Sequence, residues 1–461
     1  MAINFTGQRI LILGAGVTGL ATAHSLAKRG AKVSIADERI TQCDDFEVRT
    51  PDKFHVKDFD SLLVSPGWRF DHPLILLADA AGIKILNEID LAWSLKADLS
   101  PHQRWIALTG TNGKTTTVEL TAAMLRAGGV SAIACGNVGT TVIEAVESTE
   151  KYDVLVLELS SFQLHWLHDA TFVAAAILNI AQDHLDWHGT FEAYAKAKIS
   201  ILDRATTGIL NGDDGEVVSR SVRWQGRKVF FSLDTPAPGE VGLVEDLIVD
   251  RAFVADPKEA AMLAEVIDVS PTVPHNVSNA LAASALARTI GVEPAAIRRA
   301  IQEFKLGKHR IETILVKDEI SWVDDSKATN PHAAAASLLA TLSAVWIAGG
   351  LAKGAQMQEL VTRAKSRIKV AILFGQDRDL IAEAIRQSAP NVEIVLIDTP
   401  ERYKKGGSDN SLMEEIIRTA LSRAKAGDTV LLAPACASMD QFISYSDRGD
   451  RFKAAVEQVV R

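Results

Sequence analysis

Cysteine, excess positive charge and long apolar runs are all scarce in this sequence, and each scarcity excludes a class of protein. Three cysteines occur among 461 residues, in odd number and without the spacing of a metal cluster. A disulfide scaffold is therefore excluded, and we expect small buried thiols in a reducing compartment. The formal net charge of -9 argues against a surface that binds nucleic acid.

No apolar run approaches the length of a membrane span, and the first residues, M-A-I-N-F-T-G-Q, lack a basic segment followed by an apolar core. We therefore predict a cytoplasmic, soluble protein without a membrane partner, and we expect a monomer. With 47% hydrophobic residues, a chain of this length can form about three domains.

The stretch Trp105 to Thr117, W-I-A-L-T-G-T-N-G-K-T-T-T, has the strand, loop and helix order of a phosphate-binding site. Gly110 and Gly113 let the main chain approach an anion. Lys114 supplies a positive charge for the outer phosphates, and the hydroxyl of Thr115 can bind magnesium. A leucine replaces the first glycine of the general P-loop pattern, so the match is to a shorter loop, and the alternative is a glycine-rich turn with a solvated lysine.

A second glycine-rich turn, Gly14 to Gly19, lies between a short predicted strand and a predicted helix. A strand at 32–36 then places Asp37 at its carboxyl end. The spacing is typical of dinucleotide binding, although such a turn can hold another diphosphate or only pack a helix on a strand. The charges of Asp37, Glu38 and Arg39 either bind a ligand or belong to a solvated turn.

Two nearly unbroken apolar runs, Asp153 to Leu159 and Phe172 to Ile180, predict adjacent parallel strands covered on both faces. The first carries Glu158, and a carboxylate is rarely buried there unless it is paired or binds a metal. The second leads into 179–189, which is rich in oxygen and imidazole ligands. We therefore predict that Glu158 and His184 point at the phosphates and bind metal.

Two further pairs of polar side chains leave alternatives open. The predicted helix at 191–202 carries Lys196 and Lys198, which on residue grounds alone we interpret as a solvated pair. Asn276 and Asn279, three residues apart at a predicted helix start, either offer amides to a ligand or cap the helix.

Beyond residue 307 the pattern predicts a hairpin and then a second doubly wound sheet. Asn330 and Pro331 indicate the start of a helix, and the polar run 324–330 before it is typical of ligand binding in α/β proteins. We expect Arg402 to Asn410 to be a mobile loop.

The predicted fold class of the whole chain is three-domain α/β. It comprises a Rossmann-like domain at 1–99, a P-loop ATPase-like domain with a parallel sheet at 100–306, and a Rossmann-like domain at 307–461.

In this order the motifs resemble those of the muramyl (Mur) ligase family of peptidoglycan synthesis, over essentially the whole chain. They are T-G-T-N-G-K-T-T-T at 109–117, the strand with Glu158, N-I-A-Q-D-H-L-D-W-H-G at 179–189, Y-A-K-A-K at 194–198, H-N-V-S-N-A at 275–280, H-R-I-E at 309–312, D-D-S-K-A-T-N at 324–330 and P-A-C-A-S-M-D-Q-F at 434–442. The most similar members add D-glutamate to UDP-N-acetylmuramoyl-L-alanine. The D-N-P-R signature of the diaminopimelate-adding members is missing.

The resemblance implies an enzyme that uses ATP to phosphorylate the terminal carboxylate of a UDP-linked substrate, after which the amine of an amino acid attacks the acyl phosphate. It also implies two magnesium ions, and carbon dioxide bound as a carbamate of Lys198, which reverses the interpretation of that lysine as solvated. The implied substrates are UDP-N-acetylmuramoyl-L-alanine and D-glutamate.

The resemblance assigns roles to individual residues. Catalytic and metal-binding roles fall on Lys114, Thr115, Glu158, His184 and Lys198. The residues implied to bind ATP are Gly110, Thr111, Asn112, Gly113, Lys114, Thr115, Thr116, Asn276, Asn279, Arg310 and Asp325. Those implied to bind the UDP substrate are Gly16, Thr18, Asp37, Arg39, Ser65, Gly67 and Asn137. Those implied to hold D-glutamate are Lys327, Thr329, Lys353, Ser438, Met439 and Tyr445.

The sequence departs from the family at Leu351, where relatives often have an acidic residue, and at Lys404 to Asn410, which looks like an added loop. One alternative is a different ligase, either of the Mur type with another amino acid or similar to folylpolyglutamate synthase. A NAD-dependent oxidoreductase is a second alternative, supported by the Gly14 to Gly19 turn and Asp37. A binding module without activity is a third.

Overall fold

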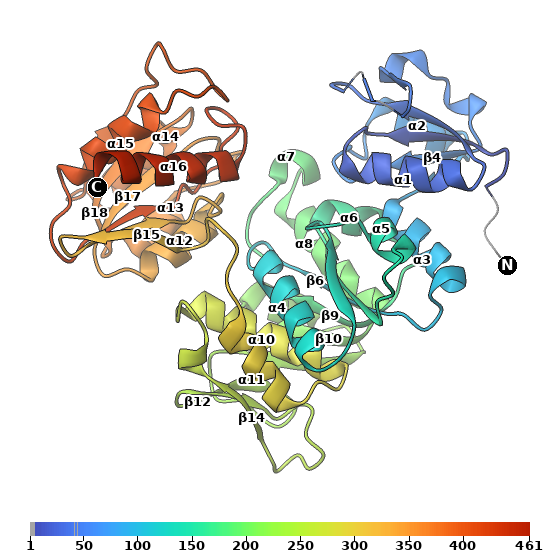
Figure 1. The fold of residues 1–461 in the computed structure, drawn as a ribbon, viewed down its shortest axis with the longest axis horizontal. Coiled ribbons are helices and arrows are strands. Elements are labelled where there is room, and N and C mark those ends of the chain that lie inside the picture. Colours follow the sequence, from blue (N-terminus) through green and yellow to red (C-terminus); the bar gives the residue numbers. More distant parts are fainter. Residues whose placement is uncertain (1–4, 41, 44) are drawn as a thin grey trace. The chain divides into compact units, whose positions relative to one another are not determined.

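The computed structural model describes residues 5–40, 42–43 and 45–461, so the first four residues of the stretch used to judge a leader lie outside it. The described chain forms three sheets with helices around them, which confirms the predicted three-domain α/β class (Figure 1). Two compact units contain these sheets: residues 1–180, 192–272 and 276–304 form one unit, and residues 181–191, 273–275 and 305–461 form the other. The domain boundaries at 99 and 306 stay predictions.

Among the described residues, no helix combines the length and the apolar character needed to cross a membrane.

The first sheet is parallel throughout, and its helices α1 (Val17–Lys28) and α2 (Pro73–Ala80) lie on opposite sides of it (Figure 1). Its strand order is β3 (Val48–Arg49), β2 (Lys32–Ala36), β1 (Arg9–Leu13), β4 (Ser61–Val64) and β5 (Lys84–Leu86). The order reverses between β1 and β4, and open α/β sheets bind ligands beyond the carboxyl ends of the strands at such a point.

The second sheet has nine strands, and all its pairings are parallel except those of β13 with β12 and with β14. Its order is β14 (Ala261–Glu265), β13 (Leu247–Asp250), β12 (Val241–Val244), β11 (Arg227–Phe231), β10 (Ala205–Asn211), β9 (Phe172–Ile177), β6 (Arg104–Thr109), β8 (Val154–Glu158) and β7 (Ala132–Gly136). The predicted adjacency of the runs at 153–159 and 172–180 is wrong, because β6 lies between β8 and β9. Apolar character identified both strands as buried, but it carries no information about their order.

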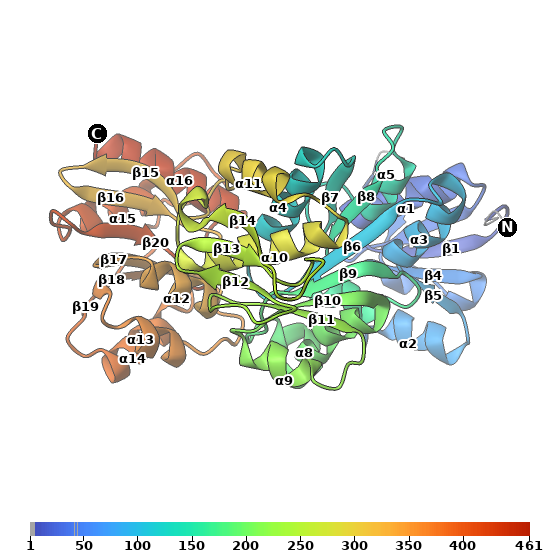
Figure 2. The ribbon, with the colours of Figure 1, turned by 90° about the horizontal axis from the view of Figure 1, so that it is seen from below.

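Helices cover both faces of this sheet, with α4 and α11 on one side and α8 and α9 on the other (Figure 2). The helices of this part of the chain are α3 (Glu88–Leu99), α4 (Lys114–Ala127), α5 (Val142–Glu147), α6 (Ser161–Trp166), α8 (Phe191–Ile199), α9 (Gly215–Ser221), α10 (Pro274–Thr289) and α11 (Pro294–Glu303). The helix predicted at 191–202 thus ends at Ile199 and continues as a 3-10 helix, Ser200–Arg204. Other 3-10 turns span Pro51–Lys53, Val56–Asp58 and Val266–Asp268.

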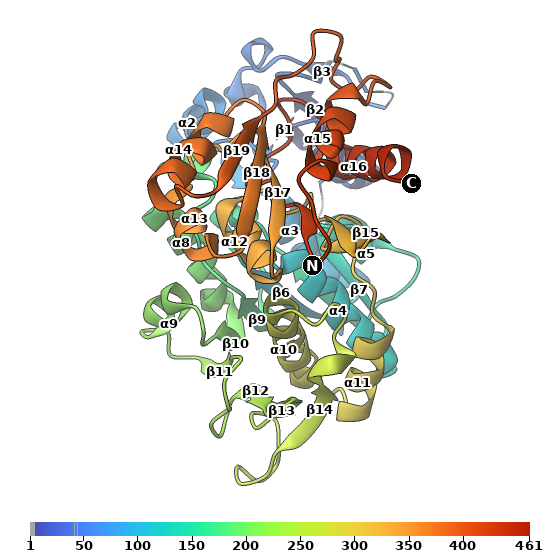
Figure 3. The same cartoon turned by 90° about the vertical axis from the view of Figure 1, so that its left-hand side faces the viewer.

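The third sheet begins with the predicted hairpin and is otherwise parallel. Its order is β15 (Glu312–Lys317), β16 (Ile320–Asp324), β20 (Thr429–Leu432), β17 (Ala344–Gly349), β18 (Ile368–Phe374) and β19 (Glu393–Leu396). Two separate apolar cores show that helices cover both faces (Figure 3). One face packs against α12 (Pro331–Leu339), α13 (Gln358–Ala364) and α14 (Arg378–Ser388), and the other against α15 (Ser411–Leu421) and α16 (Tyr445–Val459). As predicted, Asn330 caps α12 and Pro331 is its first residue.

Candidate active site

The loop between β6 and α4 has the backbone shape of a phosphate cradle. Gly113 has a positive φ of 82°, and a Cβ atom at this position would lie 2.3 Å from the side-chain oxygen of Asn279, so only glycine fits here. The ammonium group of Lys114 donates to the carbonyl oxygens of Gly110 and Thr111, at 2.8 and 2.9 Å. The lysine is thereby placed over the loop at the start of α4, where a phosphate would meet backbone N–H groups.

Asn179, at the start of the segment after β9, fixes this loop. Its carbonyl oxygen accepts from the N–H of Thr111 at 3.0 Å, and its side-chain oxygen accepts from the N–H of Asn112 at 2.8 Å. Its amide group donates back to the carbonyl oxygen of Asn112 at 3.1 Å. The sequence indicated that this segment is polar, but not that its first residue supports the phosphate loop.

Glu158 lies at the carboxyl end of β8 with only 2% of its surface exposed. One carboxylate oxygen accepts from the amide of Asn137 at 2.8 Å, while the other is buried and has no hydrogen-bond partner among the described residues. A buried carboxylate oxygen without a partner is costly unless a cation binds it. The donor set therefore fits a magnesium ion, to which Glu158 would offer its free oxygen. Asn137 follows β7, a strand that the sequence patterns did not predict.

Lys198 is buried, with 2% of its surface exposed, so the interpretation of Lys196 and Lys198 as a solvated pair is wrong for this residue. Its ammonium group donates to the carbonyl oxygen of Gly110 at 2.8 Å and to the hydroxyl of Thr109 at 3.4 Å. It also lies 4.7 Å from the centre of the Tyr194 ring. Two residues earlier on the same helix, Lys196 is exposed, as expected for positions on opposite faces.

Asn276 and Asn279 lie inside α10, because that helix begins at Pro274, and the alternative of a helix cap is therefore wrong. The amide of Asn276 donates to the carbonyl oxygen of Pro271 at 3.1 Å. The side-chain oxygen of Asn279 accepts from the hydroxyl of Thr117 at 3.3 Å, which places it beside the first turn of α4.

In the first sheet, the Gly14 turn and Ser65 meet at the point where the strand order reverses. A Cβ atom at Gly14 would lie 2.8 Å from the hydroxyl of Ser65, and this hydroxyl is buried without a hydrogen-bond partner among the described residues. Asp37 accepts N–H groups from Ala15, Arg39 and Ile40 at 2.8 to 2.9 Å. Burial opposes its ionisation, but these donors hold the pKa of Asp37 below its ordinary value. The carboxylate thus orders the turn.

His184 precedes α7 (Leu185–His188) in the segment 181–191, which belongs to the second compact unit. It has a positive φ of 53°, and its N–H donates to the carboxylate of Asp183 at 2.9 Å. The amide of Asn330 contacts the same carboxylate at 3.4 Å. Glu158 and Lys198 belong to the first unit, so joint metal binding by these residues and His184 stays a prediction.

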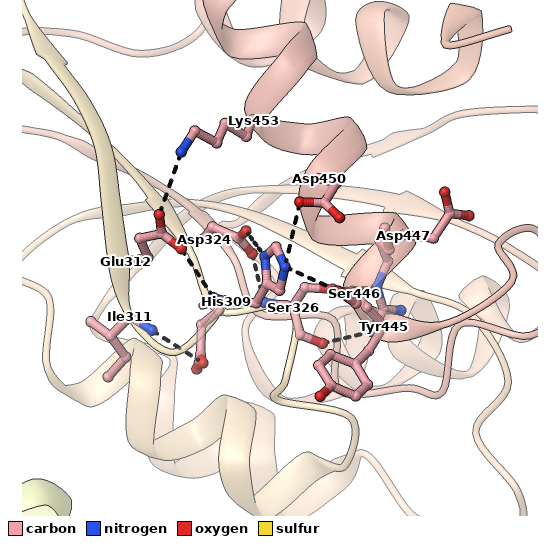
Figure 4. Close-up of polar contacts among 12 residues, drawn as sticks. His309, Ile311, Glu312, Asp324, Ser326, Tyr445, Ser446, Asp447, Asp450 and Lys453 are labelled. Atoms are coloured by element: carbon pink, nitrogen blue, oxygen red, sulfur yellow. Dashed lines mark hydrogen bonds and ion pairs between the residues drawn. The ribbon is translucent and has the colours of Figure 1, made fainter. Parts of the chain in front are cut away.

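His309 joins three parts of the C-terminal domain (Figure 4). Its Nδ1 lies 2.7 Å from the carboxylate of Asp324, its backbone N–H donates to Glu312, and its Nε2 faces Ser446 and Asp450 on α16. The hydrogen bond with Asp324 raises the pKa of His309. The side chains of His309, Glu312 and Asp324 lie close enough to ligate an ion, but His309 is bonded to Asp324, and Glu312 to the N–H of His309 and to Lys453. The network holds the β15–β16 hairpin to α16.

Arg310 and Asp325, both implied to bind ATP, flank this network. Burial raises the pKa of Asp325 to about 6, against the effect of Ser337, which donates a hydrogen bond to the carboxylate, and the charge of Arg310. The N–H of Ile311 also donates to Asp325, at 3.3 Å.

Arg448 of α16 was not singled out by the sequence, yet its guanidinium joins the loops expected to hold the amino acid. The side chain is fully buried and donates to the hydroxyl and carbonyl oxygens of Ser326, each at 2.9 Å, and to the carbonyl oxygens of Gly349 and Cys436, at 3.4 and 3.2 Å. Burial lowers its pKa to about 10. These loops carry the residues implied to hold D-glutamate at 327–329, 353 and 438–439.

Two contacts bring together other residues that are implied to hold D-glutamate, or the loops that carry them. The ammonium group of Lys327 lies 3.9 Å from the centre of the Tyr445 ring. Leu351 and Ala437 exchange two backbone hydrogen bonds of 2.9 Å, which holds the loop of Lys353 to the segment of Ser438. Leu351 thus contributes its backbone to this pairing.

Comparisons with known proteins match all three domains. The model of the "Mur ligase MurD-like, N-terminal domain" matches residues 8–87, that of the "Mur ligase middle domain" residues 108–287, and that of the "Mur ligase, glutamate ligase domain" residues 309–436. The UDP-N-acetylmuramoylalanine–D-glutamate ligase of Thermobifida fusca is 45% identical over 98% of this chain and 99% of its own length. The chain belongs to the Mur ligase family.

A second relative and a solved structure agree with this result, the relative in sequence and the structure in fold. The ligase of the same name from Streptomyces coelicolor is 43% identical over the full length of both chains. The MurF ligase of Thermotoga maritima, solved in complex with ADP, has the same fold, with a TM-score of 0.57 and 18% identity over 99% of this chain and 96% of its own. As a member of the Mur ligase family, the chain is an ATP-dependent ligase.

Proposed function

We propose that this chain joins D-glutamate to UDP-N-acetylmuramoyl-L-alanine through an amide bond, at the expense of ATP, in the synthesis of peptidoglycan precursors. The observation that carries the proposal is the similarity of the whole chain, across all three domains, to enzymes named for this reaction. The γ-phosphoryl group of ATP passes to the carboxylate of the L-alanine residue. The amine of D-glutamate then displaces phosphate from the acyl phosphate, which gives the amide, ADP and phosphate.

In this proposal the phosphate loop and Lys114 hold the triphosphate, while Thr115, Glu158, His184 and a carbamate on Lys198 bind two magnesium ions. Bound magnesium neutralises charge on the transferring phosphoryl group. The buried oxygen of Glu158, which has no hydrogen-bond partner in the described part of the chain, supports this role. Asn276, Asn279, Arg310 and Asp325 would hold adenine and ribose.

The first sheet would bind the UDP portion, through the residues implied by the family resemblance at 16–18, 37–39 and 65–67. The buried hydroxyl of Ser65 supports this placement, because it faces the glycine turn and lacks a partner among the described residues. The Lys327, Thr329, Lys353 and Ser438 group would hold D-glutamate, and two lysines suit a dicarboxylate. Monomeric state and cytoplasmic location stay predictions.

The function is tested by measuring phosphate release from ATP by the purified protein. We expect release only when magnesium, UDP-N-acetylmuramoyl-L-alanine and D-glutamate are present together. A panel of amino acids decides the substrate: release with L-alanine or L-lysine, but not with D-glutamate, would contradict the proposal.

The carbamate on Lys198 is tested by substitution and chemical rescue. We expect Lys198→Ala to lose activity and short carboxylic acids to restore part of it, because they replace the missing carboxylate. Lys196→Ala is the matched control, since this lysine lies on the exposed face of the same helix, and it should retain activity. Failure of every carboxylic acid to rescue Lys198→Ala would count against the carbamate.

A further inference from the structure

The loop of residues 399–410, between β19 and α15, has no part in the proposed function, although it contacts the segment that carries Ser438 and Met439. The loop is polar and includes two adjacent glycines, Gly406 and Gly407. Most of its charged side chains are exposed. Its inward contacts are confined to a few groups at each end.

The first half of the loop binds the main chain of residues 439–441. The ammonium group of Lys405 donates to the carbonyl oxygen of Met439, and the hydroxyl of Tyr403 donates to the carbonyl oxygen of Gln441 at 2.5 Å. In return, the amide of Gln441 donates to the hydroxyl of Thr399. Three hydrogen bonds therefore join the loop to Met439 and Gln441.

The second half of the loop is fastened to α16. The guanidinium group of Arg451 donates to the carbonyl oxygens of Asp409 and Gly407, at 2.7 and 2.5 Å, while its Nε donates to Asp447. The amide of Asn410 donates back to the carbonyl oxygen of Arg451 at 3.1 Å. Because both ends are bonded, the loop is a strap between α16 and residues 439–441.

Residues 438–442 form a tight turn with hydrogen bonds inside it and to neighbouring segments. The carbonyl oxygen of Ser438 accepts the N–H groups of Gln441 and Phe442, at 3.2 and 2.9 Å. The carboxylate of Asp440 accepts the N–H of Gln376 at 2.9 Å. The carbonyl oxygens of Met439 and Gln441 are bonded to the loop, so the strap and the Gln376 segment hold this turn between them.

The geometry points to Tyr403 and Lys405 as positioning residues for the incoming amino acid. They act through the main chain of residues 439–441 and thereby fix Ser438 and Met439, without contacting the substrate themselves. This inference rests on the proposed function for the identity of the amino acid. Its structural content, that the strap orders this turn, is independent of any substrate.

The test compares two neighbouring lysines of one loop. Both lysines are exposed, but Lys405→Met removes the bond to Met439, whereas Lys404→Met removes the same charge and leaves that bond in place. We expect Lys405→Met to raise the KM for D-glutamate by about three- to tenfold, the range given by the loss of one hydrogen bond. The KM values for ATP and for the UDP substrate should not change in Lys405→Met. Lys404→Met should have the same KM for D-glutamate as the unsubstituted protein. Lys405→Arg, which keeps a hydrogen-bond donor, should have a KM for D-glutamate close to that of the unsubstituted protein.

Amide hydrogen exchange gives a readout that needs no substrate. We expect residues 437–443 to exchange faster in Lys405→Met and Tyr403→Phe than in Lys404→Met. Equal exchange and equal KM values in Lys405→Met and Lys404→Met would overturn the inference, as would a uniform rise of all three KM values with a lower Tm. Unsubstituted protein that is inactive with D-glutamate would contradict the proposed function instead, and the exchange rates would still decide whether the strap orders the turn.

Discussion

At the scale of single residues, the candidate site is defined by two buried charged side chains, Glu158 and Lys198. Glu158 has one oxygen bonded to Asn137 and another without a partner among the described residues. Lys198 is buried beside the phosphate loop, with its ammonium group bonded to backbone and hydroxyl oxygens. Such groups are costly to bury, and a site that binds ions and phosphates explains why they are retained.

The contact of Asn137 gives a prediction that separates two roles. The family resemblance implies that Asn137 contacts the muramoyl portion of the substrate, whereas its amide here orients Glu158. Because a group that orients a metal ligand typically changes metal affinity by about 10- to 100-fold, we expect Asn137→Ala to raise the magnesium concentration for half-maximal activity by that factor. Initial rates against magnesium concentration measure it. An unchanged magnesium requirement with a higher KM for the UDP substrate would favour the contact with substrate alone.

At the scale of helices and strands, the sequence identified most elements correctly but not their neighbours. Apolar runs and glycine turns located β1, β2, β6, β8 and β9, because their residues carry the pattern locally. The order β9, β6, β8 could not be predicted, since it depends on which strands pair across the chain. The burial of Lys198 was missed on residue grounds for a similar reason: an alternation of lysine and alanine does not say which face of α8 meets the phosphate loop.

Arg448 shows the same limit within the C-terminal domain. Its partners, Ser326, Gly349 and Cys436, are distant from one another in sequence, and no motif links them. An arginine in the first turns of α16 would ordinarily be assigned to solvent. Its position only becomes informative once the strands that carry these loops are paired.

The packing of α3 against α5 gives a prediction on pH dependence. Glu88, at the start of α3, is buried and accepts the N–H of Ile143 at 2.7 Å, and burial raises its pKa from 4.5 to about 7. The folded state therefore holds a proton that the unfolded state releases above pH 4.5, so wild-type stability falls as the pH rises from about 4.5 to 7. Glu88→Gln removes this loss, and we expect its advantage in the free energy of unfolding to grow to the order of 3 kcal/mol above pH 7.

Thermal unfolding between pH 5 and pH 8 measures this difference. Glu259→Gln, at an exposed position, is the control and should show no such trend. An advantage of Glu88→Gln that is constant with pH would show that the carboxyl of Glu88 is already ionised when folded.

At the scale of the whole molecule, our proposal assigns one part of the chemistry to each sheet. In our account the first sheet presents the UDP substrate, the second holds ATP and metal, and the third holds ATP and the amino acid. The residues assigned to ATP are divided between the two compact units, with the phosphate loop in one and Arg310 and Asp325 in the other.

The most direct test of this account is the mass of the UDP-linked product. The protein is incubated with ATP, magnesium, UDP-N-acetylmuramoyl-L-alanine and an equal mixture of D-glutamate and isotope-labelled L-glutamate, and the product is analysed by mass spectrometry. We predict a substrate heavier by one unlabelled glutamate less one water, formed in equal amount with ADP. A product that carries the labelled L-glutamate, or ADP formed while the mass of the UDP substrate stays unchanged, would contradict the account.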